Sequence, residues 1–322
     1  MPAPSPPPAV RDAIVAQVRR LVGGTGDDSV ERRRTDTGLF GPESVCWRVH
    51  GDLTSMMVGG IAALLLQMLH PGALAGVWDH SDFRRDMRGR LQRTARFIAG
   101  TTYGDRAEAQ ALIDRVRGIH DQVAGALPDG RTYSANDPDL LAWVHVAEVS
   151  CFLKAYLRYV DPDLPPEAQD RYFAETAEIA RRLGAACVPE SRAEVARFLQ
   201  RMRAELRYDA RTRTVATALL SQPAPSRAAA PAMALAFDAA KVLLPGWAAD
   251  LHQFSLPAPR RLVAQVGVQA LGRTLRWGLV NSAEARARRR AAELEPEAAG
   301  AGPGPSRPPW TNAAEPSQLE KE

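Results

Sequence analysis

The least polar stretch of the chain, residues 52–69, constrains the fold more than any other feature of the sequence. Its longest uninterrupted apolar run, Met56–Leu66, is much shorter than the ~20 residues that a membrane-spanning helix needs. Gln67, His70 and Pro71 then close the run. The sequence therefore predicts a buried core helix here, and no transmembrane segment.

The rest of the chain also shows helical periodicity, with no run of alternating strands. A second strongly apolar helix follows Asp137 and Pro138, which suit an N-cap and a first helical position. We expect an all-α fold, a single domain of roughly ten helices over residues 11–283, between a disordered lead (1–10) and a disordered tail (284–322). The predicted helices cover about 9–23, 52–69, 74–78, 81–99, 105–127, 138–160, 166–183, 190–207, 211–220, 229–243 and 257–281.

Composition excludes several classes of protein. The chain is 45% hydrophobic and 24% charged, which is typical of a globular domain. Its net charge of +4 gives no support for binding nucleic acid, because the arginines are spread along the chain. Three unpaired cysteines and an N-terminus without an apolar signal region favour a reducing, cytoplasmic location.

The chain lacks the common motifs of serine hydrolases, phosphoryl transferases and zinc proteases. Histidines and arginines on apolar helices suggest instead a cofactor held between helices, most commonly haem. His120 lies beside the apolar stripe of its predicted helix, one turn after Val116, where a ligand of haem iron would be placed. The alternative is a core histidine bonded to a carbonyl.

The other histidines have weaker contexts. His145 lies among apolar residues in the middle of its helix and suits either a ligand or a packing role. His70 is expected to help end a helix, and His80, between Asp79 and the predicted N-cap Ser81, to act in capping. The sequence gives no clear context for His50 and His252.

The segment RLQRT places Arg90, Arg93 and Thr94 on one face of a helix. Two guanidinium groups and a hydroxyl group meeting there could bind haem propionates, polarise dioxygen or hold an anion. A solvated basic face is the alternative, because four further arginines lie close by in the sequence.

Taken together, three segments resemble the MpaB and rubber-oxygenase (latex-clearing-protein) family. They read GDLTSMMVGGIAALLLQMLHPGALAGVWDHSDFR, RLQRTARFIAGTTYG and VRGIHDQVAGALPDGRTYSANDPDLLAWVHVAE. The resemblance extends from about Trp47 to about Pro245. It implies a helical fold around a buried pocket for haem b, with His120 as the proximal iron ligand and His145 as a second candidate.

The resemblance also implies that Arg90, Arg93 and Thr94 lie on the distal side of the haem. Arg93 stands where the rubber-cleaving members have a lysine, and an arginine stays protonated and is not expected to bind iron. The expected function is a haem-dependent oxygenase that uses dioxygen on an apolar isoprenoid, lipid or aromatic substrate; its redox partner is unknown. A haem-binding or apolar-ligand-binding protein without turnover, and a haem-free helical protein, are the alternatives.

Overall fold

Two long apolar helices form the centre of the protein. The computed structural model describes residues 7–22, 36–279 and 283–300. Helix α3 (Leu53–Gln67) begins at Asp52, whose side chain accepts a hydrogen bond from the Ser55 amide, and α7 (Pro138–Tyr159) begins at Asp137. The two helices pack against each other at Gly59, where an added Cβ would meet the Cys151 carbonyl oxygen at 3.0 Å. A glycine is therefore required for this close approach.

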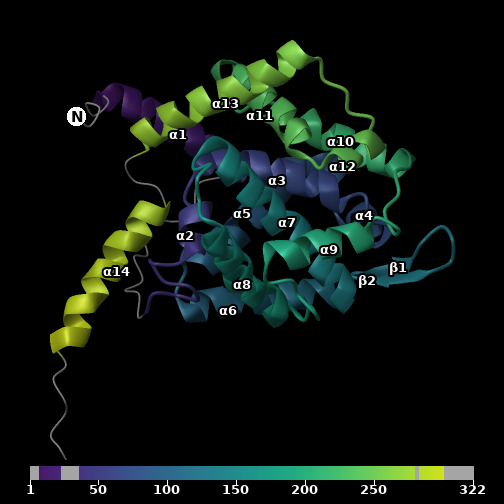
Figure 1. The fold of residues 1–322 in the computed structure, drawn as a ribbon, viewed down its shortest axis with the longest axis horizontal. Helices are drawn as coiled ribbons and strands as arrows, with labels where there is room; N and C mark the ends of the chain where they lie inside the picture. The colour runs from purple at the N-terminus through teal and green to yellow at the C-terminus, as the bar shows by residue number, and fades with distance from the viewer. Residues whose placement is uncertain (1–6, 23–35, 280–282, 301–322) are drawn as a thin grey trace, which may run out of the picture.

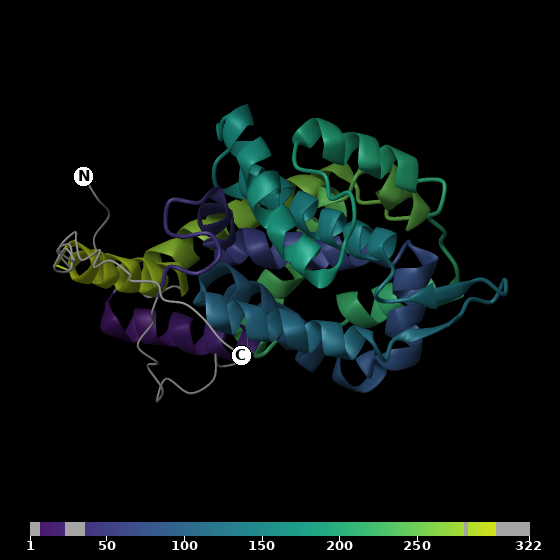
Figure 2. The ribbon, with the colours of Figure 1, turned by 90° about the horizontal axis from the view of Figure 1, so that it is seen from below.

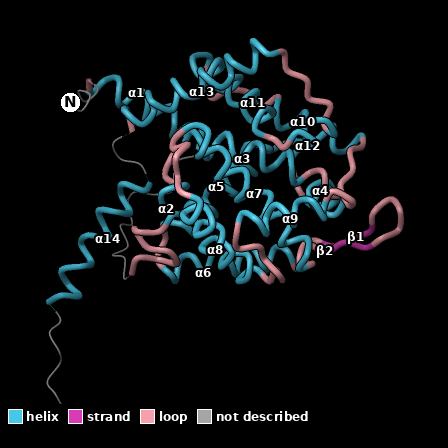
Figure 3. The backbone as a smooth tube through the Cα atoms, in the orientation of Figure 1, coloured by secondary structure: helices cyan, strands magenta, loops and turns pink. Residues whose placement is uncertain are grey.

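Fourteen α-helices surround or form this core within the described residues, as Figures 1 and 3 show. This confirms the predicted all-α class. The remaining helices are α1 (Pro8–Val22), α2 (Val45–His50), α4 (Pro71–His80), α5 (Phe83–Tyr103), α6 (Arg106–His120), α8 (Pro166–Leu183), α9 (Arg192–Met202), α10 (Ala210–Leu220), α11 (Ala230–Leu243), α12 (Gly246–Leu251), α13 (Ala258–Gly278) and α14 (Ala283–Gly300).

Two parts of the core have the length and apolar composition of a membrane span. Among the described residues these are α7 alone and the pair α3 and α4, which is bent by 102°. However, 61% of the apolar window of α7 is buried inside the protein. Gln67 donates a hydrogen bond to the Val144 carbonyl, and Trp143 donates one to the Gln67 carbonyl, which ties α3 to α7. Packing in the core thus accounts for the apolar composition of both helices.

A β-hairpin replaces the end of one predicted helix. The pattern predicts a helix over 105–127, but α6 ends at His120, and β1 (Ala124–Ala126) pairs antiparallel with β2 (Thr132–Ser134). Leu127 and Tyr133 are buried against Ala75 of α4, so tertiary packing outweighs the helical spacing. The hairpin projects from the helical body in two perpendicular views (Figures 1 and 2).

Helical structure also extends into both predicted disordered ends. Residues 8–10 of the expected lead belong to α1, and residues 1–6 lie outside the described part. The sequence predicts a disordered tail from residue 284, whereas the structure has α14 there. Ala287 of α14 is buried against Trp47 and Tyr103, and this contact stabilises the helix. Residues 301–322 lie outside the described part.

Candidate functional site

The antiparallel helices α5 and α6 carry most of the predicted site residues. They are joined at Gly104 and Asp105, and an added Cβ on Gly100 would collide with Leu112. Each helical residue adds about 1.5 Å along the axis. Measured from the contact between Gly100 and Leu112, Arg90 therefore lies ~15 Å toward the start of α5, and His120 lies ~12 Å toward the end of α6. Both residues therefore lie toward the same end of the helix pair, away from the connecting turn.

His120 is the last residue of α6 and continues its inward face. Ala109 and Ile113 are buried on this face, and Val116 and His120 are half-buried. The Nδ1 atom of His120 is enclosed and has no hydrogen-bond partner among the described residues. Burial lowers the pKa of His120, against the opposing effect of Asp121. A neutral imidazole with an unused ring nitrogen can serve as a metal ligand.

Arg90 is the arginine of the RLQRT segment that faces inward. Arg90 is half-buried, and its guanidinium group donates a hydrogen bond to the Ser81 hydroxyl at 3.3 Å. In the part of the chain that the structure describes, Arg90 forms no ion pair. Burial, followed by the nearby Arg93, lowers the pKa of Arg90. Such a guanidinium group is suited to binding an anion.

Thr94 and Arg93, which share the helix face of Arg90 in the RLQRT segment, differ in their exposure. Thr94 is half-buried, and its hydroxyl donates to the Arg90 carbonyl oxygen at 3.3 Å. Arg93 has 62% of its side chain exposed and pairs with Asp86 at 3.2 Å. Asp86 has non-helical backbone angles, and its carboxylate also accepts from the Gly89 amide. This break in α5 gives Arg93 an acidic partner, so the structure groups Arg90 with Thr94 more closely than with Arg93.

His145 lies deep in the core on α7. It is 8% exposed, and its Nε2 atom is enclosed and has no hydrogen-bond partner in the part of the chain that the structure describes. Burial, and to a lesser extent Arg181, lowers its pKa to about 4. Glu148 follows one helical turn later, and burial raises its pKa to about 7. No described residue forms a hydrogen bond or ion pair with the Glu148 carboxyl group, so α7 carries two neighbouring polar groups without partners.

His50 joins three helices, a role that the sequence did not reveal. Its Nδ1 lies 2.8 Å from the Thr102 hydroxyl of α5, and its Nε2 lies 2.9 Å from the Tyr172 hydroxyl of α8. Burial lowers the pKa of His50 to about 3, and the nearby His145 contributes. His50 is thus neutral and anchors α5 to the core, although no local motif marks it.

The remaining histidines have structural partners. His70 was expected to help end a helix, but it caps the start of α4, where its side chain accepts a hydrogen bond from the Gly72 amide. His80 ends α4 and donates to the Ala124 carbonyl at 3.2 Å, while Asp79 accepts from Tyr133. The prediction of His80 at a helix start is therefore wrong, because the hairpin supplies its partner. The N-cap of α5 is Asp82 in place of the predicted Ser81.

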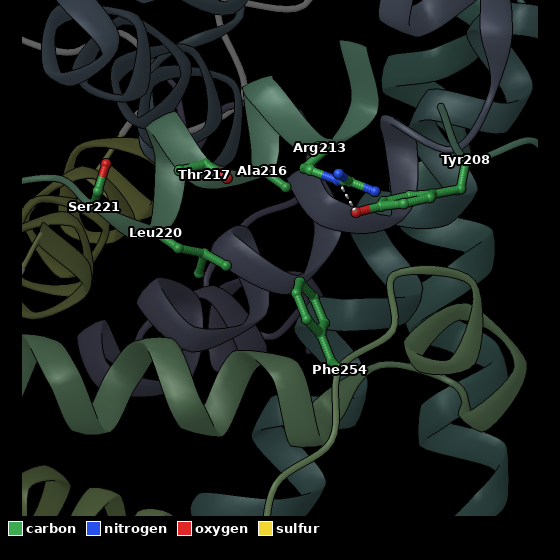
Figure 4. A pocket seen from close by; sticks show the side chains of 7 residues that line it. All are labelled: Tyr208, Arg213, Ala216, Thr217, Leu220, Ser221 and Phe254. Atoms are coloured by element: carbon green, nitrogen blue, oxygen red, sulfur yellow. Dashed lines mark hydrogen bonds between the residues drawn. The ribbon is translucent and has the colours of Figure 1, made fainter. Parts of the chain in front are cut away.

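His252 is buried, and its Nε2 donates to the Leu65 carbonyl oxygen at 2.8 Å. Tyr208 and Phe254, which contact its ring, also line an open hollow of about 230 Å³. Figure 4 shows this hollow, with Arg213 donating a hydrogen bond to the Tyr208 hydroxyl. None of the predicted site residues lines it.

Comparison with known proteins identifies one family. A family model described as "ER-bound oxygenase mpaB/B'/Rubber oxygenase, catalytic domain" matches residues 47–277. No curated protein and no solved structure matches the chain significantly. Within the described residues, no group of three or more histidine, cysteine, aspartate or glutamate side chains is arranged to hold a metal ion.

Proposed function

The chain belongs to the mpaB and rubber-oxygenase family, and we propose that it is a haem b-dependent oxygenase acting on an apolar isoprenoid, lipid or aromatic substrate. The match of an oxygenase catalytic domain to residues 47–277 is the observation that carries this proposal. The substrate class and the haem are our own inference, supported by the side chains at the end of the α5–α6 pair away from the connecting turn.

The residues present fit a haem. His120 offers a neutral imidazole whose enclosed ring nitrogen has no partner among the described residues, and it could bind the iron of a haem. Arg90 offers a half-buried guanidinium group without an acidic partner, which suits a propionate or another anion. Both groups are costly to bury without partners. The iron of a bound cofactor would satisfy the first group, and a propionate or another anion would satisfy the second.

Haem, when bound, would supply the redox chemistry that activates dioxygen. The protein residues would perform the remaining tasks. His120 would hold the cofactor from α6, and Arg90 would donate hydrogen bonds to negative charge that develops on oxygen. The Thr94 hydroxyl, now bonded to the Arg90 carbonyl, would orient a water molecule or dioxygen beside it. His50 would keep α5 in place through Thr102.

Two further features belong to this proposal. Arg93 would have to break its ion pair with Asp86 before it could act beside Arg90. We therefore assign it a smaller part than Arg90. We also propose a cytoplasmic location, which three free cysteines support, two of them buried and Cys187 exposed.

Oxygen consumption in the presence of isoprenoid, lipid and aromatic candidates tests the proposal. We expect substrate-dependent uptake, reduced at least about tenfold by Arg90→Ala, as for other donors to a developing oxyanion. Arg88→Ala is the matched control, because Arg88 lies on the same helix and is exposed. Haem binding without uptake on any candidate would favour the alternative of a non-catalytic haem protein. Equal effects of both variants would remove Arg90 from the mechanism.

A further inference from the structure

Exposed large apolar side chains are most concentrated on one helix of the protein. Among the described residues, those with the greatest exposure are Ile119 (54%), Leu251 (36%), Leu262 (62%), Val263 (60%) and Val266 (54%). Three of them belong to α13, and Leu251 ends the short helix that precedes it. Isolated exposed apolar residues need no explanation, but such a concentration marks an interaction surface.

The three residues of α13 share one side of the helix, which we call the α13 stripe: Leu262, Val263 and Val266. They stand at positions i, i+1 and i+4. The opposite side, with Ala264, Val268 and Gly272, is buried. Gly267 lies close to the Leu235 side chain of α11, and α13 lies along the upper edge of the molecule in Figure 1. The helix is therefore anchored by one side and presents the stripe outward.

The charges of α13 are all of one sign. The helix contains four arginines and no acidic residue. Arg260 pairs with Asp238 at 2.6 Å, and Arg276 pairs with Asp52 at 2.7 Å. Arg261 and Arg273 are exposed, and neither has an ion-pair partner among the residues described. Arg273 follows Val266 by two helical turns and so lies on the side of the stripe.

We infer that α13 docks on the surface of an anionic lipid bilayer. The stripe enters the boundary between headgroups and acyl chains, and Arg273, on the same side of the helix, binds lipid phosphates. A second copy of this chain fits the surface poorly. A two-fold contact would place each α13 against its equivalent and bring unpaired arginines together. The inference is independent of the proposed oxygenase activity.

Flotation of the full-length protein with vesicles tests the inference. We expect binding to phosphatidylcholine vesicles that contain phosphatidylglycerol, and much weaker binding to phosphatidylcholine alone. The double variant Leu262→Gln, Val266→Gln should weaken binding at least about tenfold, because it removes buried apolar area. Arg273→Glu should weaken it similarly on anionic vesicles, because it reverses the charge beside the stripe.

Ile119→Gln is the matched control, because Ile119 is equally exposed but lies on α6, outside the stripe. It should bind vesicles like the wild type. Circular dichroism would verify that each variant keeps its helical content. Absence of binding to anionic vesicles, or equal binding by the α13 variants, would overturn the inference. Dimerisation of the wild-type protein that the Leu262→Gln, Val266→Gln variant abolishes would also overturn it, in favour of a second copy.

Discussion

Glu148→Gln should make the protein more stable at neutral and alkaline pH. Glu148 is half-buried on α7 and has no hydrogen-bond or ion-pair partner among the described residues. Burial raises its pKa to about 7, from an ordinary value of 4.5. Glutamine has nearly the same shape as the protonated acid and never ionises. The substitution therefore removes the cost of burying a carboxylate while leaving the packing of α7 unchanged.

The sign and size of the effect follow from the two pKa values. Below pH 4.5 the acid is protonated in both the folded and the unfolded chain, so it does not affect stability. Between pH 4.5 and about 7 the unfolded chain loses its proton first, and the folded wild type becomes progressively less stable. The difference between the two pKa values of Glu148 corresponds to about 3 kcal/mol in the free energy of unfolding. Partial contact with solvent reduces the expected gain of the variant to about 1–3 kcal/mol above pH 7.

Urea denaturation of both proteins at pH 5 and pH 8 measures this gain. The free energies of unfolding should differ little at pH 5 and most at pH 8. Glu167→Gln on α8 is the control, because Glu167 is exposed; it should change stability by less than about 0.5 kcal/mol at either pH. A gap between Glu148→Gln and wild type that is independent of pH, or a variant less stable than wild type at pH 8, would refute the reasoning.

Two further predictions concern the core. His50→Leu should lower the free energy of unfolding by about 2–4 kcal/mol in urea titrations, because it leaves the Thr102 and Tyr172 hydroxyls unpaired. Tyr172→Phe should lower the free energy of unfolding by clearly less. Equal losses in the two variants would argue against the hydrogen bonds of His50 with Thr102 and Tyr172. Gly59→Ala should lower the melting temperature, since its Cβ would lie 3.0 Å from the Cys151 carbonyl oxygen. Gly60→Ala, with its nearest neighbour at 3.7 Å, should raise stability by up to about 1 kcal/mol; the reverse order would contradict the described packing.

Much of the fold could be predicted from helical periodicity and capping residues. The bounds of α3 and α7 follow from Asp52 and Asp137, each of which caps its helix as a short acidic side chain before an apolar run should. The hairpin could not be predicted, because Val123 and Leu127 continue a helical spacing that only packing against α4 overrides. The short helix α2 was missed, since six residues give too little periodicity to recognise.

Part of the arrangement of the candidate site residues could be predicted from the sequence. His120 and Arg90 could be singled out from residue type and helical face, and their helix ends lie at the same end of the α5–α6 pair. The exposure of Arg93 could not be foreseen, because it depends on the local break at Asp86. The role of His50 could not be predicted for another reason. Its partners are far away in the sequence, and pairing across three helices leaves no local pattern.

The haem content of the purified protein tests the central claim most directly. A visible spectrum and a pyridine haemochrome assay should give a Soret band and close to one haem b per chain. His120→Ala should lose the haem, whereas His145→Ala should retain it. Loss of haem only in His145→Ala would move the iron ligand to α7. A wild-type protein that stays colourless after haem is added would contradict the proposal of a haem-dependent oxygenase.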